Sequence, residues 1–397
     1  MFASRRRLLV LLIALGVGVP VVALAGFLAL RDDPPADPPA ALEMHPLAGT
    51  FAPDDTKLDD CRAGSDEARC LEQAFGNLSY NEGPKAALAR FDRLRAKPGT
   101  AESNCHRIAH SIGSAALARY DGDVGRAFAE GSASCWSGYY HGILERALVG
   151  ADTDAELTSA VRGICGEILA TATRYVSYQC VHGLGHGLMI RTGLHLERAL
   201  DGCEGLRTEW EQTSCDGGVF MENFSSSYGV KSRWLRDDDL LYPCNAVAEK
   251  HKLYCYLQIT DRLLSGTGWD WEKTAEECAR AETAWRATCF QSFGRSASGI
   301  SRGNTAELVR LCSIPRGDDR ADCVYGAARD RVSNDAGAGR AAAFCGQAPA
   351  RARCFEGIGT ILVTLAPDAG RTRTACAEAA PAAADRAACL RGAGIAA

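Results

Sequence analysis

Apolar side chains recur at helical spacing along the chain. Leu157, Val161 and Ile164 fall on one face of a helix, and Leu196 and Leu200 repeat the pattern further along. Spacing of this kind is typical of an amphipathic helix that buries one stripe of side chains. In both segments the stripe runs into a cysteine. We therefore predict an all-α fold built from short amphipathic helices.

The eighteen cysteines fall into neighbouring pairs, and from Cys165 onward the first members recur every 31 to 41 residues. A period in this range is typical of stacked helical repeats. Zinc sites made of cysteine are disfavoured, because even pairing leaves none over and no Cys-x-x-Cys occurs. We predict an α-solenoid-like series of disulfide-linked helical-hairpin repeats. The expected pairs are Cys61 with Cys70, Cys105 with Cys135, Cys165 with Cys180, Cys203 with Cys215, Cys244 with Cys255, Cys278 with Cys289, Cys312 with Cys323, Cys345 with Cys354, and Cys376 with Cys389.

A Cys-x-x-Gly motif follows the second cysteine of most pairs. It begins at Cys135, Cys180, Cys215, Cys323, Cys354 and Cys389. A small residue lets two helices approach closely, and we expect the motif to start the second helix of each hairpin. Thr153 and Glu156 form a separate helix-start signal, since their spacing is that of a capping box.

The N-terminus carries the signals for localisation. Three arginines precede an uncharged run over residues 8–30, which is long enough to cross a bilayer. The arginines favour a cytoplasmic tail at 1–7, a transmembrane signal anchor at 8–30 and a folded part outside the cytoplasm. A cleavable signal peptide is the alternative, since small residues at Ala23 and Ala25 suit cleavage, and the protein would then be secreted. Residues 31–60 read as a proline-rich linker.

Composition narrows the class of protein. The 397 residues are 47% hydrophobic and 23% charged, as in an ordinary globular chain. The formal net charge of -5 gives no reason to expect a nucleic-acid partner. The many cysteines suit an oxidising compartment. We expect a capping unit at 61–104, histidine-rich repeats at 105–230 and further helical repeats at 231–397.

Five of the eight histidines carry the candidate chemistry. His106 and His110, and likewise His182 and His186, are four residues apart, so each pair lies on one helix face. His141 and His186 share a register, because each is the sixth residue after the second cysteine of its pair. The later repeats have no histidine there, and we expect them to serve as scaffold. Two such pairs among eight histidines exceed what chance spacing gives, which favours a metal site over isolated structural histidines.

The remaining candidate residues flank these histidines. Glu145 and Glu222 are candidate carboxylate ligands or general bases, and Tyr139 and Tyr140 are candidate substrate-binding residues. Imidazole-rich sites suit zinc, which we take as the default, and also copper or iron. Haem is less favoured, because no Cys-x-x-Cys-His is present for covalent attachment. A buried histidine network without metal is the structural alternative.

Two functional hypotheses remain. The first is a membrane-anchored, extracytoplasmic metalloenzyme, a hydrolase or oxidoreductase acting on a small-molecule or peptide substrate that the sequence leaves unidentified. The second is a non-catalytic solenoid scaffold that binds a protein, peptide or glycan. The first expects the five histidines to converge beside a pocket, whereas the second expects them to be scattered.

Overall fold

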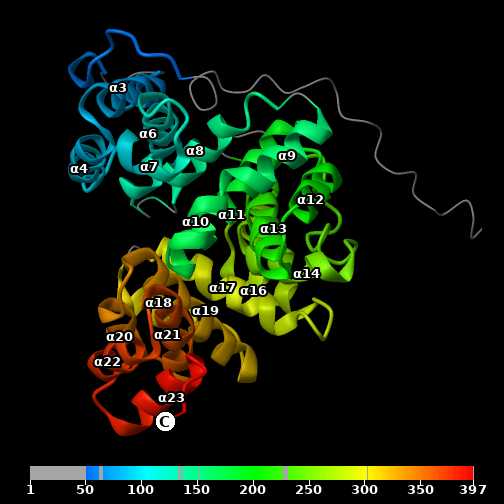
Figure 1. Ribbon diagram of the computed structural model, residues 1–397. Coiled ribbons are helices and arrows are strands. Elements are labelled where there is room, and N and C mark those ends of the chain that lie inside the picture. Colours follow the sequence, from blue (N-terminus) through cyan, green and yellow to red (C-terminus); the bar gives the residue numbers. More distant parts are fainter. Residues whose placement is uncertain are drawn as a thin grey trace, which may run out of the picture. The chain divides into compact units, whose positions relative to one another are not determined.

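The computed structural model describes residues 51–61, 66–132, 135, 137–151, 153–226, 231–301 and 303–396. Within these ranges every regular element is a helix, so the all-α prediction is confirmed (Figure 1). The predicted tail and signal anchor at 1–30, and the linker up to residue 50, lie outside the described residues. Among the helices that are described, none combines the length and the apolar character that crossing a bilayer requires.

The helices of the N-terminal half differ widely in length. They are the 3₁₀-helix η1 (Leu58–Asp60) and the α-helices α3 (Glu67–Glu82), α4 (Pro84–Arg95), α5 (Thr100–Ser103), α6 (Cys105–Arg119), α7 (Val124–Ala129), α8 (Gly138–Ala147), α9 (Asp154–Ile164), α10 (Gly166–Thr171), α11 (Arg174–Arg191), α12 (Leu196–Glu204) and α13 (Glu209–Phe224).

The C-terminal half likewise contains helices of different lengths. Its helices are α14 (Glu249–Gln258), α15 (Thr260–Gly266), α16 (Trp271–Ala279), α17 (Arg286–Ile300), α18 (Thr305–Leu311), α19 (Gly317–Asp335), α20 (Gly339–Cys345), α21 (Arg351–Leu365), α22 (Ala369–Ala379) and α23 (Ala383–Gly392).

Successive long helices pack against one another in chain order. Contacts join α3 to α6, α6 to α8, α8 to α11, α11 to α13, α13 to α14, α14 to α17, α17 to α19, α19 to α21, and α21 to α23. A contact between α11 and α21 departs from this order. In the same region the Tyr175 hydroxyl of α11 donates to the Ser333 carbonyl of α19 over 2.7 Å. Helical repeats far apart in sequence are therefore brought together within one compact unit that extends from Leu42 to Ala397.

Nine disulfides join the eighteen cysteines in the neighbouring pairs that the sequence predicts. Their Cα atoms lie 5.4 to 5.9 Å apart. Several bridges tie a short helix to the long helix after it: Cys203 of α12 bonds Cys215 of α13, and Cys278 of α16 bonds Cys289 of α17. So many bridges are typical of a protein in an oxidising compartment outside the cytoplasm.

The long helices begin earlier than the Cys-x-x-Gly motif suggests. Only α8 starts within the motif, whereas α13 starts well before Cys215. The reason is local capping: the Thr208 side chain accepts from the backbone N–H of Glu211, and the Glu211 carboxylate accepts from the Thr208 N–H. The capping box predicted at Thr153 is present at the start of α9.

The glycine of the motif marks a close helix contact, as expected. A Cβ atom placed on Gly218 would lie 1.9 Å from the carbonyl oxygen of His182, and one on Gly138 would lie 2.7 Å from that of His106. A methyl group has no room at either position. The backbones of α11 and α13, and of α6 and α8, therefore pack directly against each other next to the histidines.

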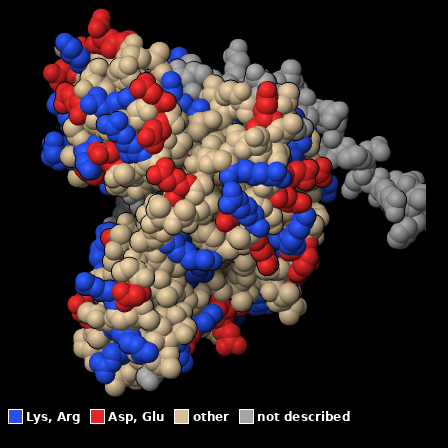
Figure 2. All heavy atoms as spheres, in the orientation of Figure 1, with Lys and Arg blue, Asp and Glu red and all other residues tan. Residues whose placement is uncertain are grey.

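Charged side chains of both signs are interspersed over the face drawn in Figure 2. Some of the ion pairs link successive repeats. Arg286 of α17 donates to both carboxylate oxygens of Asp319 of α19, and Arg351 of α21 does the same to Asp385 of α23. Pairs with this degree of exposure contribute about 0 to 1 kcal/mol each, so the buried helix contacts and the disulfides dominate stability.

Candidate metal centre

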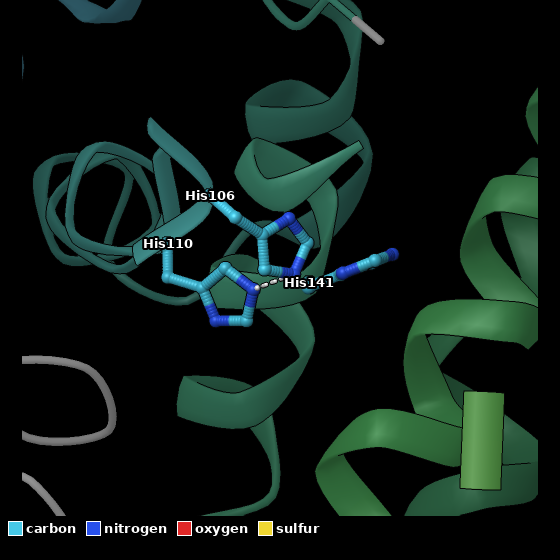
Figure 3. Close-up of side chains that lie close together, drawn as sticks. All are labelled: His106, His110 and His141. Atoms are coloured by element: carbon cyan, nitrogen blue, oxygen red, sulfur yellow. Dashed lines mark hydrogen bonds between the residues drawn. The ribbon is translucent and has the colours of Figure 1, made fainter. Parts of the chain in front are cut away.

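Five histidines from three helices come together in the interior. His106 and His110 lie on α6, His141 on α8, and His182 and His186 on α11. Ring centroids are 4.5 Å apart for His106 and His110, 5.2 Å for His106 and His141, 4.0 Å for His141 and His186, and 5.1 Å for His182 and His186. Figure 3 shows the first three rings grouped together. The scattered arrangement that the scaffold hypothesis expects is not found.

His141 lies at the centre of this cluster. It belongs to two groups of three histidines whose ligand atoms are within 4.8 Å of one another: one with His106 and His110, and one with His182 and His186. Its side chain is 1% exposed, and neither of its ring nitrogens has a hydrogen-bond partner among the described residues. Buried polar atoms are almost always partnered, so both nitrogens are suited to a ligand.

Two carboxylates contact the cluster from outside. The Nδ1 atom of His110 lies 2.7 Å from a carboxylate oxygen of Glu145 on α8, and the Nδ1 atom of His186 lies 2.9 Å from one of Glu222 on α13. All four side chains are almost fully buried. A carboxylate that accepts the Nδ1 proton fixes the ring orientation and leaves Nε2 as the ligand atom.

His106 and His182 are held in the same manner by other oxygens. The Nδ1 atom of His106 lies 2.8 Å from the carbonyl oxygen of Cys135, and the Nδ1 atom of His182 lies 3.2 Å from the Tyr178 hydroxyl. The Nε2 atoms of His106 and His110 are 3.0 Å apart, which is the contact drawn in Figure 3. With Nδ1 engaged at all four outer histidines, their Nε2 atoms are left for the interior of the cluster.

Burial sets the protonation of these rings. It lowers the pKa of His106, His141 and His182 well below the usual value, and neighbouring histidines lower it further. Burial and the charge of His110 lower the pKa of His186 to about 3. At His110 burial also acts to lower the pKa, but the carboxylate of Glu145 outweighs it and the net pKa is raised. Neutral imidazole is the form that binds metal, so the lowered pKa values prepare His106, His141, His182 and His186 for ligation near neutral pH.

Glycines beside the histidines allow the three helices to meet. A Cβ on Gly185 would lie 2.0 Å from the carbonyl oxygen of Cys215, and one on Gly183 would lie 2.4 Å from the side chain of Leu144. The glycine-rich segment around His186 is therefore explained by neighbouring helices that pack on both sides of it, and no ligand has to approach its backbone.

The two predicted substrate-binding tyrosines lie in the core. The Tyr139 hydroxyl donates to the Ala127 carbonyl over 2.7 Å, and Tyr140 stacks on Phe128 with ring centroids 4.7 Å apart. Neither lines the cavity next to the histidines. Their contacts are those of packing residues.

A cavity of about 260 Å³ lies beside the cluster, and His141 and His182 form part of its wall. Sequence reasoning missed three other wall residues, Tyr178, Arg295 and Arg329. The two arginines are in the same register as His141, because each is the sixth residue after the second cysteine of its repeat. The later repeats, which the sequence predicts to serve as scaffold, thus contribute α17 and α19 to the cavity wall.

Comparisons with known proteins add no analogy: no protein-family model, curated protein or solved structure matches this chain. Its function has to be argued from the geometry of the histidine cluster and the cavity.

Proposed function

We propose that the five histidines bind a transition-metal ion, with zinc as the default, and that the chain is a metalloenzyme acting outside the cytoplasm. The observation that carries this proposal is His141. It is buried, lacks a hydrogen-bond partner on either ring nitrogen and is shared by two groups of three histidines. A single imidazole between two such groups suits either one ion or a pair of ions with His141 between them.

The enzyme assignment follows from the number of ligands. Three histidines fill three of the four positions that zinc prefers, and the fourth is then available to a water molecule. Zinc lowers the pKa of such a water to about 7, which makes it a nucleophile for hydrolysis. Copper and iron accept the same ligands and would instead support oxidation. The cavity beside His141 and His182 gives a substrate access to this position.

The buried carboxylates take a positioning role in this proposal. Glu145 and Glu222 each contact the Nδ1 atom of a histidine, which favours orientation of His110 and His186 over action as a general base.

The membrane anchor at 8–30 remains part of the proposal as well. It rests on the hydrophobic run that follows the N-terminal arginines, and on the disulfides that place the folded part in an oxidising compartment.

The test is elemental analysis of the purified full chain, produced with its disulfides formed, beside a His141→Gln variant. Gln keeps a polar side chain of similar size but cannot bridge the two groups of histidines. We expect stoichiometric zinc, copper or iron in the natural protein and its loss, or a clear reduction, in the variant. The metal identified decides between hydrolysis and oxidation, and absorbance in the visible range reports haem.

The matched control is His195→Asn. His195 precedes α12, where its side chain accepts the backbone N–H of Arg198, and Asn fills the same capping position well. This variant removes a histidine without touching the cluster and should keep its metal. Equal metal content in His141→Gln and the natural protein, or none in either, would contradict the proposal.

A further inference from the structure

Two arginines line the cavity beside the histidines. Arg295 of α17 and Arg329 of α19 line it together with His141 and His182. The two arginines come from C-terminal repeats and the two histidines from N-terminal repeats. The cavity therefore exists because helices distant in sequence meet, as the contact between α11 and α21 shows.

Arg295 has no carboxylate partner among the described residues. It makes a weak hydrogen bond, in which Nη2 donates to the sulfur of Met221 over 3.6 Å. Arg295 lines the same cavity as His141 and His182. Asp330 also lines this cavity and interacts with Arg295 through its charge, but the two side chains form no ion pair at short range.

Arg329 is also short of acceptors. Its Nη1 atom lies 3.5 Å from the amide oxygen of Gln291, at the limit of a hydrogen bond, and its Nε atom is buried without a partner in the described part of the chain. A guanidinium group presents planar, paired donors that match a carboxylate or a phosphate. Leaving such donors unpaired in a partly buried site is costly unless a ligand accepts from them.

Aromatic side chains also line this cavity. Tyr178 and Tyr254 line the cavity and stack with ring centroids 6.4 Å apart and an interplanar angle of 26°. The Tyr178 hydroxyl also reaches His182, so this surface leads to the candidate metal centre. A ligand in this cavity can meet both the charged donors of the arginines and the ring faces of the two tyrosines.

We propose that this cavity binds a small organic anion whose carboxylate or phosphate group accepts from Arg295 and Arg329 and whose remaining part lies along Tyr178 and Tyr254. This inference deepens the proposed function, since it names the class of substrate and relies on the metal site for any chemistry. Binding of the anion itself needs only the arginines and the tyrosines.

The experiment is isothermal titration calorimetry on the purified full chain, both as isolated and after removal of metal by a chelator. The probes are benzoate, its neutral counterpart benzamide, and inorganic phosphate. Measurements on metal-stripped protein matter because either anion can also ligate a metal directly. The variants are Arg295→Gln, Arg329→Gln and the charge-preserving Arg295→Lys. The control is Arg310→Gln, an exposed arginine of α18 that pairs with Glu307.

We expect benzoate or phosphate to bind the metal-stripped protein and benzamide to bind much more weakly. Loss of charged hydrogen bonds should weaken anion binding about tenfold or more in each Gln variant, with an intermediate effect in Arg295→Lys and none in Arg310→Gln. Whether benzoate or phosphate binds more tightly identifies the acidic group. Circular dichroism confirms that each variant is folded, and Arg295→Lys carries the test if a Gln variant is not.

Three results would overturn the inference: no saturable binding of either anion, equal affinity for benzoate and benzamide, or Gln variants that bind like the natural protein. Failure of the proposed function gives a different result. In that case the elemental analysis finds no metal, while the arginine-dependent binding of the anion is unchanged.

Discussion

At the scale of single residues, the cluster depends on which nitrogen of each ring is engaged. The oxygens that contact Nδ1 of the outer histidines come from a carboxylate, a carbonyl or a hydroxyl group, and in each case Nε2 is left facing inward. His141 differs, because neither of its nitrogens is engaged by a described residue. The outer rings are thus oriented by the protein, and the central ring is the one most dependent on a ligand.

Replacing Glu222 by Gln tests this orientation. Gln can still accept a hydrogen bond from His186 but lacks the charge that supports the ring as a ligand, so we expect metal affinity to fall about 10- to 100-fold. Competition with a chromogenic chelator measures the change. Glu209→Gln is the control, because Glu209 is exposed at the start of the same helix. Equal affinity in Glu222→Gln and the natural protein would exclude a positioning role.

Asp330 provides a test by pH. It lines the cavity, and burial, partly opposed by the charge of Arg295, raises its pKa from 3.8 to about 6. Between these values the folded protein holds a proton that the unfolded chain has lost, so this group makes the protein less stable as pH rises from about 4 through 6. Its other polar neighbours are Ser298, Asn334 and Asp261.

We expect Asp330→Asn to remove this dependence and to gain stability relative to the natural protein above pH 6 but not at pH 4. Urea unfolding at several pH values measures the difference. The same variant should bind benzoate more tightly at pH 7, because it removes a negative charge from the cavity. A stability difference that is constant from pH 4 to pH 7 would show that the charge of Asp330 is not the cause.

Several of these residues were predictable from sequence and others were not. A spacing of four residues on a helix predicts two histidine pairs, His106 with His110 and His182 with His186. Tyr139 was assigned to substrate on proximity in sequence alone, but its side chain faces the other side of α8, where it reaches Ala127. The direction of a side chain depends on which neighbouring helix covers each face, and sequence spacing does not contain that information.

At the scale of helices, glycine sets how closely the repeats approach. We expect Gly218→Ala to destabilise the protein by about 1 to 3 kcal/mol or more, because the added methyl group would lie 1.9 Å from the carbonyl oxygen of His182. Gly163→Ala on α9 is the control. Its Cβ would meet nothing within 4 Å, so improved helix propensity should stabilise the protein by about 0.5 to 1 kcal/mol.

Chemical denaturation of the two alanine variants, followed by circular dichroism, gives both values. The same direction of change in the two variants would contradict the close-contact explanation.

Helix existence, the capping box at Thr153 and the cysteine pairing were all predictable, since each depends on residues near one another in sequence. The Cys-x-x-Gly motif predicts starts of the long helices that are too late, because capping residues such as Thr208 start these helices earlier.

At the scale of the whole molecule, two disulfides of nearly equal loop length allow a matched comparison. The bridge between Cys203 and Cys215 closes 12 residues, and that between Cys376 and Cys389 closes 13. Replacing either pair by serine should cost a similar free energy of unfolding, about 2 to 4 kcal/mol. Only the first pair holds α13, which carries Glu222, so only its removal should also weaken metal binding.

Thermal unfolding and chelator competition on the two double-serine variants separate these effects. Equal loss of metal affinity in both variants would mean that the cluster responds to global stability and not to the position of α13.

The sequence alone does not predict that Arg295 and Arg329 line the same cavity as His141. The shared register of Arg295, Arg329 and His141 is visible in the chain, but which repeats face one another depends on a small rotation accumulated over every repeat between them. Local sequence patterns specify the fold of each repeat, whereas the curvature of the series depends on the rotations of all the repeats together.

The contact between α11 and α21 also fixes how many repeats the protein can have. An open row of repeats can gain or lose a unit through duplication or deletion and keep its binding surface. Here, excision of a repeat between these two helices would leave the neighbouring repeats able to stack, yet would carry Arg295 and Arg329 away from His141. We therefore expect recombination to add or remove repeats only at the ends of the series. In the middle of the series, sequence variation should be limited to single substitutions.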